Sequence, residues 1–226
     1  MLSNLFKRTI TSLMLIALLL IGLFYNELSW KILVILFLIL CLYEFNNLIR
    51  KIYKNKFIIV SLLFLVILYL YFFYFLLIKI RSEYGEEKIL ILLISCILSD
   101  IGGYFVGKSI GGPKLTSLSP NKTISGAFGS IIFTVIGTSI FLILLNKIDT
   151  NSINLEVSLK FYIWLISMSI FCQIGDLLIS YMKRKANIKD TGKILPGHGG
   201  ILDRVDGIIF AIPFGVLTYF ILFLSL

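Results

Sequence analysis

Acidic, basic and glycine residues crowd the stretch between Ser180 and Asp206, and their types suit phosphate chemistry. The glycines that flank His198 form a flexible turn whose backbone amides can face an anion. Asp203 and Asp206 are three residues apart and share a face at the start of the last helix, with Arg204 between them. Mg²⁺ is typically held by one or two carboxylates plus substrate phosphates, so acids beside cations predict a metal–polyphosphate site. The cations that can neutralise phosphates here are Lys183, Arg184, Lys189 and Lys193.

Two more acids, Asp100 and Asp176, lie inside apolar stretches, where a charge costs at least about 2.5–3.5 kcal/mol. In the predicted topology, the chain passes through both stretches from the outer side of the membrane to the cytoplasmic side. At a helical rise of 1.5 Å per residue, each acid then lies about 9–10 Å below the cytoplasmic edge of the membrane. Two buried like charges repel unless a cation or proton lies between them, so we expect a shared divalent cation. Asp176, Ser180 and Lys183 are spaced i, i+4 and i+7, which places an acid, a hydroxyl and an ammonium on one helix face. The alternative is that each acid pairs separately with a lysine or caps a broken helix.

The elements that must position these residues are membrane helices, because the chain is too apolar for a soluble protein. Of its 226 residues, 58% are hydrophobic and 15% are charged, against roughly 45–50% and 25% in soluble domains. This composition excludes a water-soluble enzyme, a disordered chain and a disulfide scaffold. Three cysteines match no metal motif and are predicted to be small core residues: Cys41, Cys96 and Cys172.

Seven stretches are long and apolar enough to cross, as helices, a bilayer core about 30 Å thick. They cover residues 10–25, 30–45, 57–78, 89–107, 124–145, 161–182 and 207–225. The net charge of +9 follows the positive-inside rule rather than indicating nucleic acid, since 15 of the 21 lysines and arginines fall on the side of the N-terminus. We therefore expect an all-α polytopic membrane helix bundle with a cytoplasmic N-terminus and a C-terminus outside.

The chain is predicted to form a single integral membrane domain over residues 1–226. Residues 1–90 would supply N-terminal helices, and residues 91–226 the catalytic part. Loops 108–123 and 183–206 are expected on the cytoplasmic side, and they are the segments rich in Gly, Pro, Ser and Lys. The outer loops are short and nearly neutral, so chemistry is expected on the cytoplasmic side.

The stretch from Ser180 to Asp206 closely resembles the signature of the phosphatidate cytidylyltransferase family, also called CDP-diacylglycerol synthases. The fixed positions of that signature are all present: Ser180, Lys183, Arg184, Lys189, Asp190, Gly192, Leu195, Pro196, His198, Gly199, Gly200, Asp203, Arg204 and Asp206. Asp100 with Gly103 and Gly107, and Asp176 within Gly-Asp-Leu, also look like the family. Residues 119–123 resemble a further family element, but Ile-Ser-Gly then replaces the usual Trp-Glu-Gly, so Ser125 stands where the family has an acid.

The resemblance implies transfer of CMP from CTP to phosphatidic acid with Mg²⁺, which yields CDP-diacylglycerol and pyrophosphate. The catalytic residues expected are Asp176, Lys183, Lys189, Asp190, His198, Asp203, Arg204 and Asp206. The substrate-binding residues expected are Ser119, Lys122, Ser180, Arg184, Gly199 and Gly200. The metal ligands expected are drawn from Asp100, Asp176, Asp190, Asp203 and Asp206. A phosphate monoester is already nucleophilic, so His198 is expected to donate to phosphate or organise the loop rather than act as a base.

Other interpretations stay open at this point. A different CTP-dependent lipid enzyme, such as a polyprenol kinase, would share the membrane and the nucleotide, whereas an ion-coupled transporter would use Asp100 and Asp176 as an ion path. The polar loop is also compatible with a solvated, positive-inside segment that has a salt-bridged helix start. As an enzyme, the protein is expected in the cytoplasmic membrane with its site facing the cytoplasm. Its expected partners are CTP, phosphatidic acid and the bilayer, with no nucleic acid, and a homodimer is a family expectation.

Overall fold

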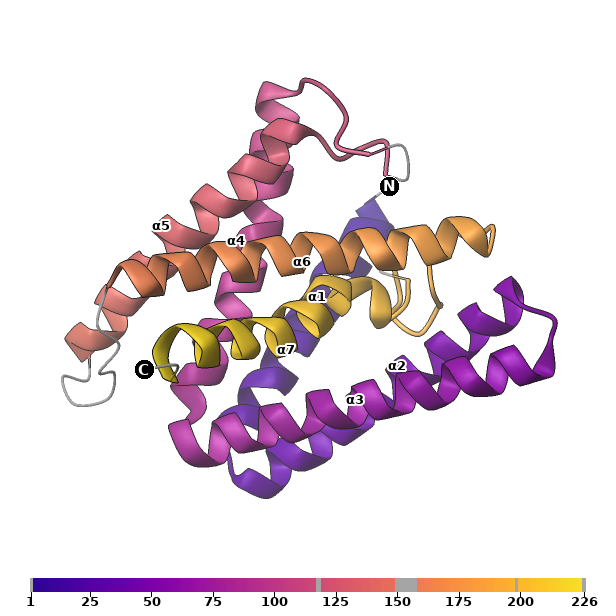
Figure 1. The fold of residues 1–226 in the computed structure, drawn as a ribbon, viewed down its shortest axis with the longest axis horizontal. Helices are drawn as coiled ribbons and strands as arrows, with labels where there is room; N and C mark the ends of the chain where they lie inside the picture. The colour runs from indigo at the N-terminus through magenta and orange to yellow at the C-terminus, as the bar shows by residue number, and fades with distance from the viewer. Residues whose placement is uncertain (1, 117–118, 149–157, 198, 225–226) are drawn as a thin grey trace. The chain divides into compact units, whose positions relative to one another are not determined.

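The computed structural model describes residues 2–116, 119–148, 158–197 and 199–224. Most of these residues lie in seven α-helices, which confirms the predicted all-α class (Figure 1). The helices are α1 (Leu2–Phe24), α2 (Glu27–Ile52), α3 (Lys56–Tyr84), α4 (Glu86–Ile110), α5 (Ile124–Ile148), α6 (Leu159–Lys185) and α7 (Leu202–Leu224). Each predicted apolar stretch corresponds to one of these helices.

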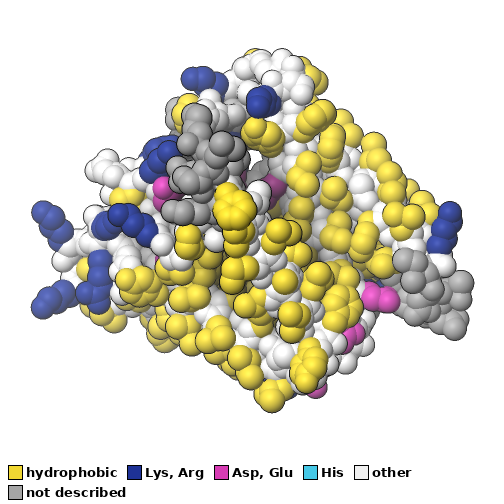
Figure 2. Space-filling view, turned by 180° about the vertical axis from the view of Figure 1, so that it is seen from behind, with side chains coloured by type: hydrophobic (Ala, Val, Ile, Leu, Met, Phe, Trp, Pro, Cys, Tyr) yellow, Lys and Arg dark blue, Asp and Glu magenta, His cyan; other side chains and the backbone are white. Residues whose placement is uncertain are grey.

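Helices α2 to α7 are long and apolar enough to cross a membrane. These helices are 22 to 29 residues long, and the most apolar 18-residue window of each has a mean hydropathy of 1.7 to 2.6; about 20 apolar residues suffice to cross a membrane. Large hydrophobic side chains also cover much of the face in Figure 2, as a lipid-facing surface requires. The protein is therefore an integral membrane helix bundle. The apolar part of α1 is shorter, Arg8–Phe24, so six of the seven predicted spans meet the length criterion in the described residues.

The chain divides into two compact units. The first unit consists of Met1–Glu86 and Met182–Val205, and it contains α1, α2, α3 and the loop between α6 and α7. The second unit consists of Glu87–Tyr181 and Asp206–Leu226, and it contains most of α4, α5, α6 and α7. The predicted single domain, with N-terminal helices up to residue 90, stays a prediction. Residues 182–205, which the sequence assigned to the catalytic part, belong to the same unit as the N-terminal helices.

In the first unit, α2 and α3 lie side by side as an antiparallel pair (Figure 1). Asn26 and Ser29 form a capping box that starts α2 directly after α1. Buried Arg81, near the end of α3, donates to the Leu23 carbonyl at the end of α1 from Nε (3.1 Å) and Nη2 (2.8 Å). The same guanidinium pairs with Glu86 at 2.9 Å, so one side chain joins three helix ends.

In the second unit, small residues let helices pack closely. A Cβ on Gly102 of α4 would lie 2.5 Å from the Gly129 carbonyl of α5, and one on Gly175 of α6 would lie 2.5 Å from the Asp206 carbonyl of α7. Such contacts are typical of membrane helix interfaces, where small residues let backbones approach. The predicted core role of the cysteines is confirmed: Cys41, Cys96 and Cys172 are at most 1% exposed, and all three are free thiols.

Candidate functional site

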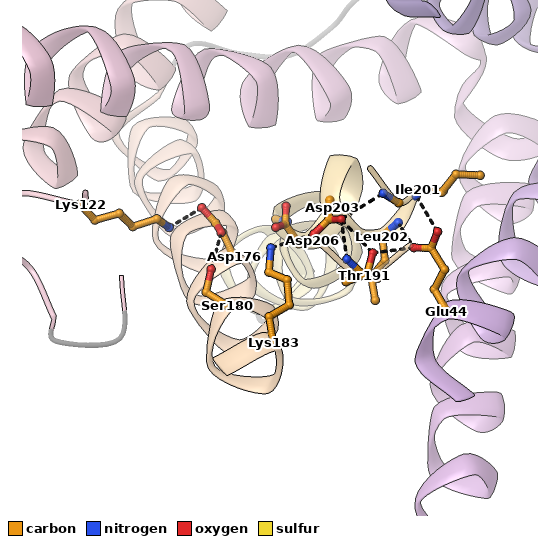
Figure 3. A network of polar contacts seen from close by, with 12 residues as sticks. Glu44, Lys122, Asp176, Ser180, Lys183, Thr191, Ile201, Leu202, Asp203 and Asp206 are labelled. Atoms are coloured by element: carbon orange, nitrogen blue, oxygen red, sulfur yellow. Dashed lines mark hydrogen bonds and ion pairs between the residues drawn. The ribbon is translucent and has the colours of Figure 1, made fainter. Parts of the chain in front are cut away.

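Asp203, at the start of α7, is the centre of a polar cluster in the first unit (Figure 3). Its Oδ1 accepts a hydrogen bond from the Lys183 ammonium at 2.8 Å. Its Oδ2 accepts the backbone amides of Thr191 (2.8 Å) and Gly200 (3.1 Å) and lies 3.0 Å from the Thr191 hydroxyl. The Asp203 side chain is only 6% exposed and that of Lys183 16%, so this is a desolvated ion pair. The structure thus brings together two residues that the sequence predicted as catalytic.

Glu44, in the C-terminal third of α2, holds the same loop from the other side (Figure 3). Its carboxylate is fully buried. Oε1 accepts the Ile201 amide at 3.0 Å, while Oε2 accepts the Leu202 amide at 2.9 Å and the Thr191 hydroxyl at 2.7 Å. These amides begin α7, where a carboxylate satisfies free N–H groups and the positive end of the helix dipole. Glu44 therefore caps a helix from 157 residues away.

The Thr191 hydroxyl joins the two carboxylates. Its oxygen lies 2.7 Å from Glu44 Oε2 and 3.0 Å from Asp203 Oδ2. A hydroxyl carries a single proton, so it serves one carboxylate fully or divides its bond between the two. The orientation of Asp203 is consequently linked, through one side chain, to that of Glu44.

Glycines of the loop give Glu44 room to approach the backbone. A Cβ on Gly192 or on Gly200 would collide with the Glu44 carboxylate, and one on Gly200 would also collide with the Thr191 hydroxyl. Gly199 has φ +89°, a conformation that favours glycine. The sequence predicted a flexible turn for the glycines around His198, which include Gly199 and Gly200 but not Gly192. The contacts with Glu44 add a steric role for Gly192 and Gly200, and the predicted substrate-binding role of Gly199 and Gly200 stays a prediction.

A separate cluster lies in the second unit (Figure 3). Lys122, just before α5, pairs with Asp176 of α6, and the Ser180 hydroxyl donates to Asp176 Oδ1 at 3.3 Å. The Lys122 side chain is 25% exposed and that of Asp176 30%, so solvent and ligands can reach the pair. The predicted i, i+4 relation of Asp176 and Ser180 therefore produces a hydrogen bond.

The two other acids of this unit that the sequence predicted as metal ligands, Asp100 and Asp206, have different surroundings. Asp100 is exposed on α4, and its Oδ1 lies 3.7 Å from the Cys172 thiol. Asp206 is half-buried on α7, and its Oδ1 accepts the Gly207 amide at 3.0 Å. Among the described residues, no three His, Cys, Asp or Glu side chains are grouped so that they could hold a metal ion. Asp176 pairs with Lys122, as the alternative to a shared cation predicted for it, whereas Asp100 forms no ion pair with a described lysine.

The loop before α5 is ordered by its own hydroxyls. Ser125, at the position where the resemblance leads us to expect an acid, donates to the Gly111 carbonyl at 2.5 Å and lies 2.9 Å from the Thr123 hydroxyl. The Ser119 carbonyl accepts the Lys122 amide at 3.0 Å, which forms the turn that carries Lys122 to Asp176. Ser125 thus shapes the loop.

Four further predicted site residues are exposed: Arg184, Lys189, Asp190 and Arg204. Asp190 lies close to Gly199, where a Cβ would be 3.2 Å from the Asp190 Cβ. The predicted phosphate donor His198 lies outside the described residues. The roles predicted for these residues stay predictions.

Sequence reasoning assigned no role to Glu44, although a signal was available. Glu44 is an acid at the end of the apolar stretch predicted over residues 30–45, and an ionisable residue in such a stretch usually has a partner. Its partners are backbone amides and a hydroxyl rather than charged side chains, so no sequence motif marks them.

Comparison with known proteins supports the resemblance. The chain is 39% identical over 144 residues to a phosphatidate cytidylyltransferase of Helicobacter pylori, which covers 63% of this chain and 51% of the relative. It is 41% identical over 148 residues to the enzyme of that name from Bacillus subtilis, covering 64% and 51%, and 42% identical over 134 residues to that from Staphylococcus aureus, covering 59% and 48%. The matches thus span about half the length of these curated relatives.

The family match covers α3 to α6, most of α7 and both lysine–aspartate pairs, while Glu44 lies outside it. The model of the cytidylyltransferase family matches residues 53–223, which include Lys122, Asp176, Lys183 and Asp203. The match extends well beyond the signature that first indicated the resemblance. This chain belongs to the cytidylyltransferase family.

Proposed function

We propose that this protein is a phosphatidate cytidylyltransferase that transfers CMP from CTP to phosphatidic acid, releasing pyrophosphate. The observation that carries the proposal is the Lys183–Asp203 pair, in which a nearly buried carboxylate is fixed by backbone amides and holds an ammonium at 2.8 Å. Both residues belong to the signature, and the named relatives share about 40% identity with this chain. The names of the relatives supply the substrate class.

The proposed reaction needs charge neutralisation more than proton transfer. A phosphate oxygen of the lipid attacks the α-phosphorus of CTP, an O–P bond forms, and the bond to the pyrophosphate oxygen breaks. Both reactants are anions, so the main tasks are alignment and stabilisation of charge. Lys183 is the best-placed cation, because Asp203 positions its ammonium. Lys122, which pairs with Asp176, is a second cation that neutralises phosphate charge. The exposed cations Arg184, Lys189 and Arg204 supply further positive charge.

We propose Mg²⁺ as the cofactor, because hard divalent cations take carboxylate oxygens as ligands. The ligands proposed are drawn from Asp100, Asp176, Asp190, Asp203 and Asp206. Among the described residues no three of these acids are grouped around one point, but Asp176 is partly exposed, and Asp176 and Asp203 each hold a lysine ammonium, which binds where a cation is favoured. The ion would supply charge neutralisation on the phosphates.

The proposed setting is the cytoplasmic membrane, with seven spans, the N-terminus and the site on the cytoplasmic side, and the C-terminus outside. The distribution of lysines and arginines supports this orientation. A lipid headgroup lies at the membrane surface, where a soluble nucleotide can meet it. A homodimer is proposed on the family resemblance alone.

Labelled CTP tests the proposed reaction. Purified protein with phosphatidic acid and Mg²⁺ should move the α-phosphorus label, but not the γ label, into the lipid fraction. Transfer of the γ label to a lipid alcohol would instead indicate a kinase and overturn the proposal. Lys183→Gln should abolish the α transfer, whereas Lys31→Gln, which removes an exposed lysine paired with Glu27, should leave it within twofold. When each of the four common NTPs is supplied in a separate assay, turnover is expected with CTP.

A further inference from the structure

The first unit contains a hollow that lies outside the Lys183–Asp203 pair. It measures about 600 Å³, within the range of small-molecule sites. One wall is the C-terminal part of α2, with Tyr43, Asn47, Arg50 and Lys51, and the other is the loop at Thr191 and Lys193. Lys183 and Asp203 do not line it. The hollow is therefore distinct from the ion pair proposed for the transfer reaction.

The walls of this hollow are basic. Arg50, Lys51 and Lys193 are all exposed, and none of them forms an ion pair with a described acid. Arg50 Nε donates to Asn46 at 2.8 Å, which fixes one edge of the guanidinium on α2. The acid behind the loop wall is Glu44, whose buried oxygens already accept three hydrogen bonds. Asp203, also behind Thr191, is neutralised by Lys183, and Asp190 precedes Thr191 in the chain without lining the hollow. The lining itself contains three cations and no acid, so it carries net positive charge.

We propose that this hollow binds a phosphate group, either on an anionic lipid headgroup or on a soluble phosphate compound. Arginine and lysine are the side chains that bind phosphate through charge-assisted hydrogen bonds, and Asn47 and Tyr43 add uncharged donors. Cytoplasmic loops of membrane proteins are generally basic, but here cations from two segments more than 140 residues apart converge on one hollow. That convergence indicates a site. The inference goes beyond the transfer reaction and does not depend on it.

The site is physically linked to Asp203 through Thr191. This residue lines the hollow, while its amide and hydroxyl contact Asp203 and its hydroxyl also contacts Glu44. A phosphate in the hollow therefore touches the loop that orients Asp203. Binding and the proposed chemistry share one structural element.

Direct binding measured without divalent metal tests the site. The full chain is placed in phosphatidylcholine nanodiscs with EDTA, and the probes are radiolabelled dihexanoyl phosphatidylglycerol and radiolabelled inorganic phosphate, neither of which takes part in the proposed transfer; each is followed by equilibrium dialysis. We expect saturable binding of at least one probe, and the probe that binds more tightly identifies the lipid or the soluble source. Failure of both probes to bind saturably would overturn the proposal.

Matched charge removals separate the hollow from its surroundings. Lys51→Gln with Lys193→Gln should weaken binding at least tenfold. Lys54→Gln with Lys56→Gln removes the same charge from exposed positions just after α2 that do not line the hollow, and should change binding less than twofold. Equal losses in both pairs would indicate a net-charge effect and contradict a site. Weakening by Lys183→Gln, without weakening by the Lys51 and Lys193 pair, would place the phosphate at Asp203 and also overturn the proposal.

The binding test and the transfer test can fail independently. Binding in EDTA requires no turnover, and α-label transfer from CTP does not require the hollow. Monodisperse elution of each variant from a sizing column confirms that it folds. If the double variant elutes as aggregate, Arg50→Gln alone replaces it, with an expected loss of at least threefold.

Discussion

Replacing Glu44 should release the loop that holds Asp203. In Glu44→Ala the amides of Ile201 and Leu202 lose the acceptor that the carboxylate provides. Both residues are at most 7% exposed, so water does not readily replace that acceptor. The Thr191 hydroxyl still has a hydrogen-bond acceptor in Glu44→Ala, because Asp203 Oδ2 lies 3.0 Å away.

The magnitude follows from these two amides. A buried donor left without a partner costs about 1–3 kcal/mol, so two of them cost about 2–6 kcal/mol. At about 1.4 kcal/mol per factor of ten, the lower limit corresponds to a roughly 30-fold rise in the opening of the first turn of α7. Glu44→Gln keeps one carbonyl oxygen and should fall between the native protein and Glu44→Ala.

Hydrogen–deuterium exchange of the peptide that contains residues 199–204 measures this opening directly. The exchange of the Ile201 and Leu202 amides should accelerate at least 30-fold in Glu44→Ala, as worked out from their lost acceptor. Glu27→Ala is the matched control on the same helix, because Glu27 is 54% exposed and forms a surface ion pair with Lys31, and such exposed pairs contribute little to stability. Exchange that is the same in Glu44→Ala and Glu27→Ala would refute the assignment of Glu44 as the cap of α7.

Four other outcomes are expected. Asp203→Asn should lower CTP turnover at least 100-fold while the thermal unfolding profile stays cooperative, because the Lys183 ammonium loses its charged partner; near-native turnover would remove Asp203 from the mechanism. Turnover should stop in EDTA and return with Mg²⁺, and its persistence in chelator would argue against a metal requirement. Gly200→Ala should accelerate exchange in the same peptide, because its Cβ would collide with Glu44 and Thr191; unchanged exchange would show that the loop accommodates the methyl group. In sealed right-side-out vesicles an impermeant amine reagent should label Lys147 and spare Lys7 and Lys54, and the reverse pattern would contradict the orientation proposed from the charge distribution.

Hydropathy predicted the helices well because membrane-spanning segments need both apolar side chains and internal backbone hydrogen bonds. It underestimated their lengths where helices continue beyond the apolar core. Helix α2, for example, was predicted over residues 30–45 but extends from Glu27 to Ile52 through Asn46 and Arg50. The polar residues there continue the helix, and two of them stabilise it through their side chains: Arg50 Nε donates to Asn46 Oδ1, one turn earlier, at 2.8 Å. Hydropathy has no signal for such an extension.

Motif spacing identified the acids and lysines of the candidate site but not their pairing. Lys183 lies on the predicted face with Asp176 and Ser180, yet its ammonium binds Asp203, 20 residues further along the chain. Glu44 reaches its partners across 147 to 158 residues. Contacts of this range depend on how the chain folds back, and backbone amides carry no residue identity that a motif can show. The predicted metal and substrate ligands accordingly stay predictions.

The two oxygens of Asp203 have different kinds of partner, and this difference has consequences for function. Oδ2 is held by two backbone amides and the Thr191 hydroxyl, groups that belong to the loop and cannot leave it. Oδ1 is held by a lysine ammonium on a flexible stem, which can turn toward an arriving phosphate. The carboxylate can therefore exchange its cationic partner while its position stays fixed. A residue with both oxygens bound to lysines would move when either lysine left, whereas Asp203 remains oriented throughout such an exchange.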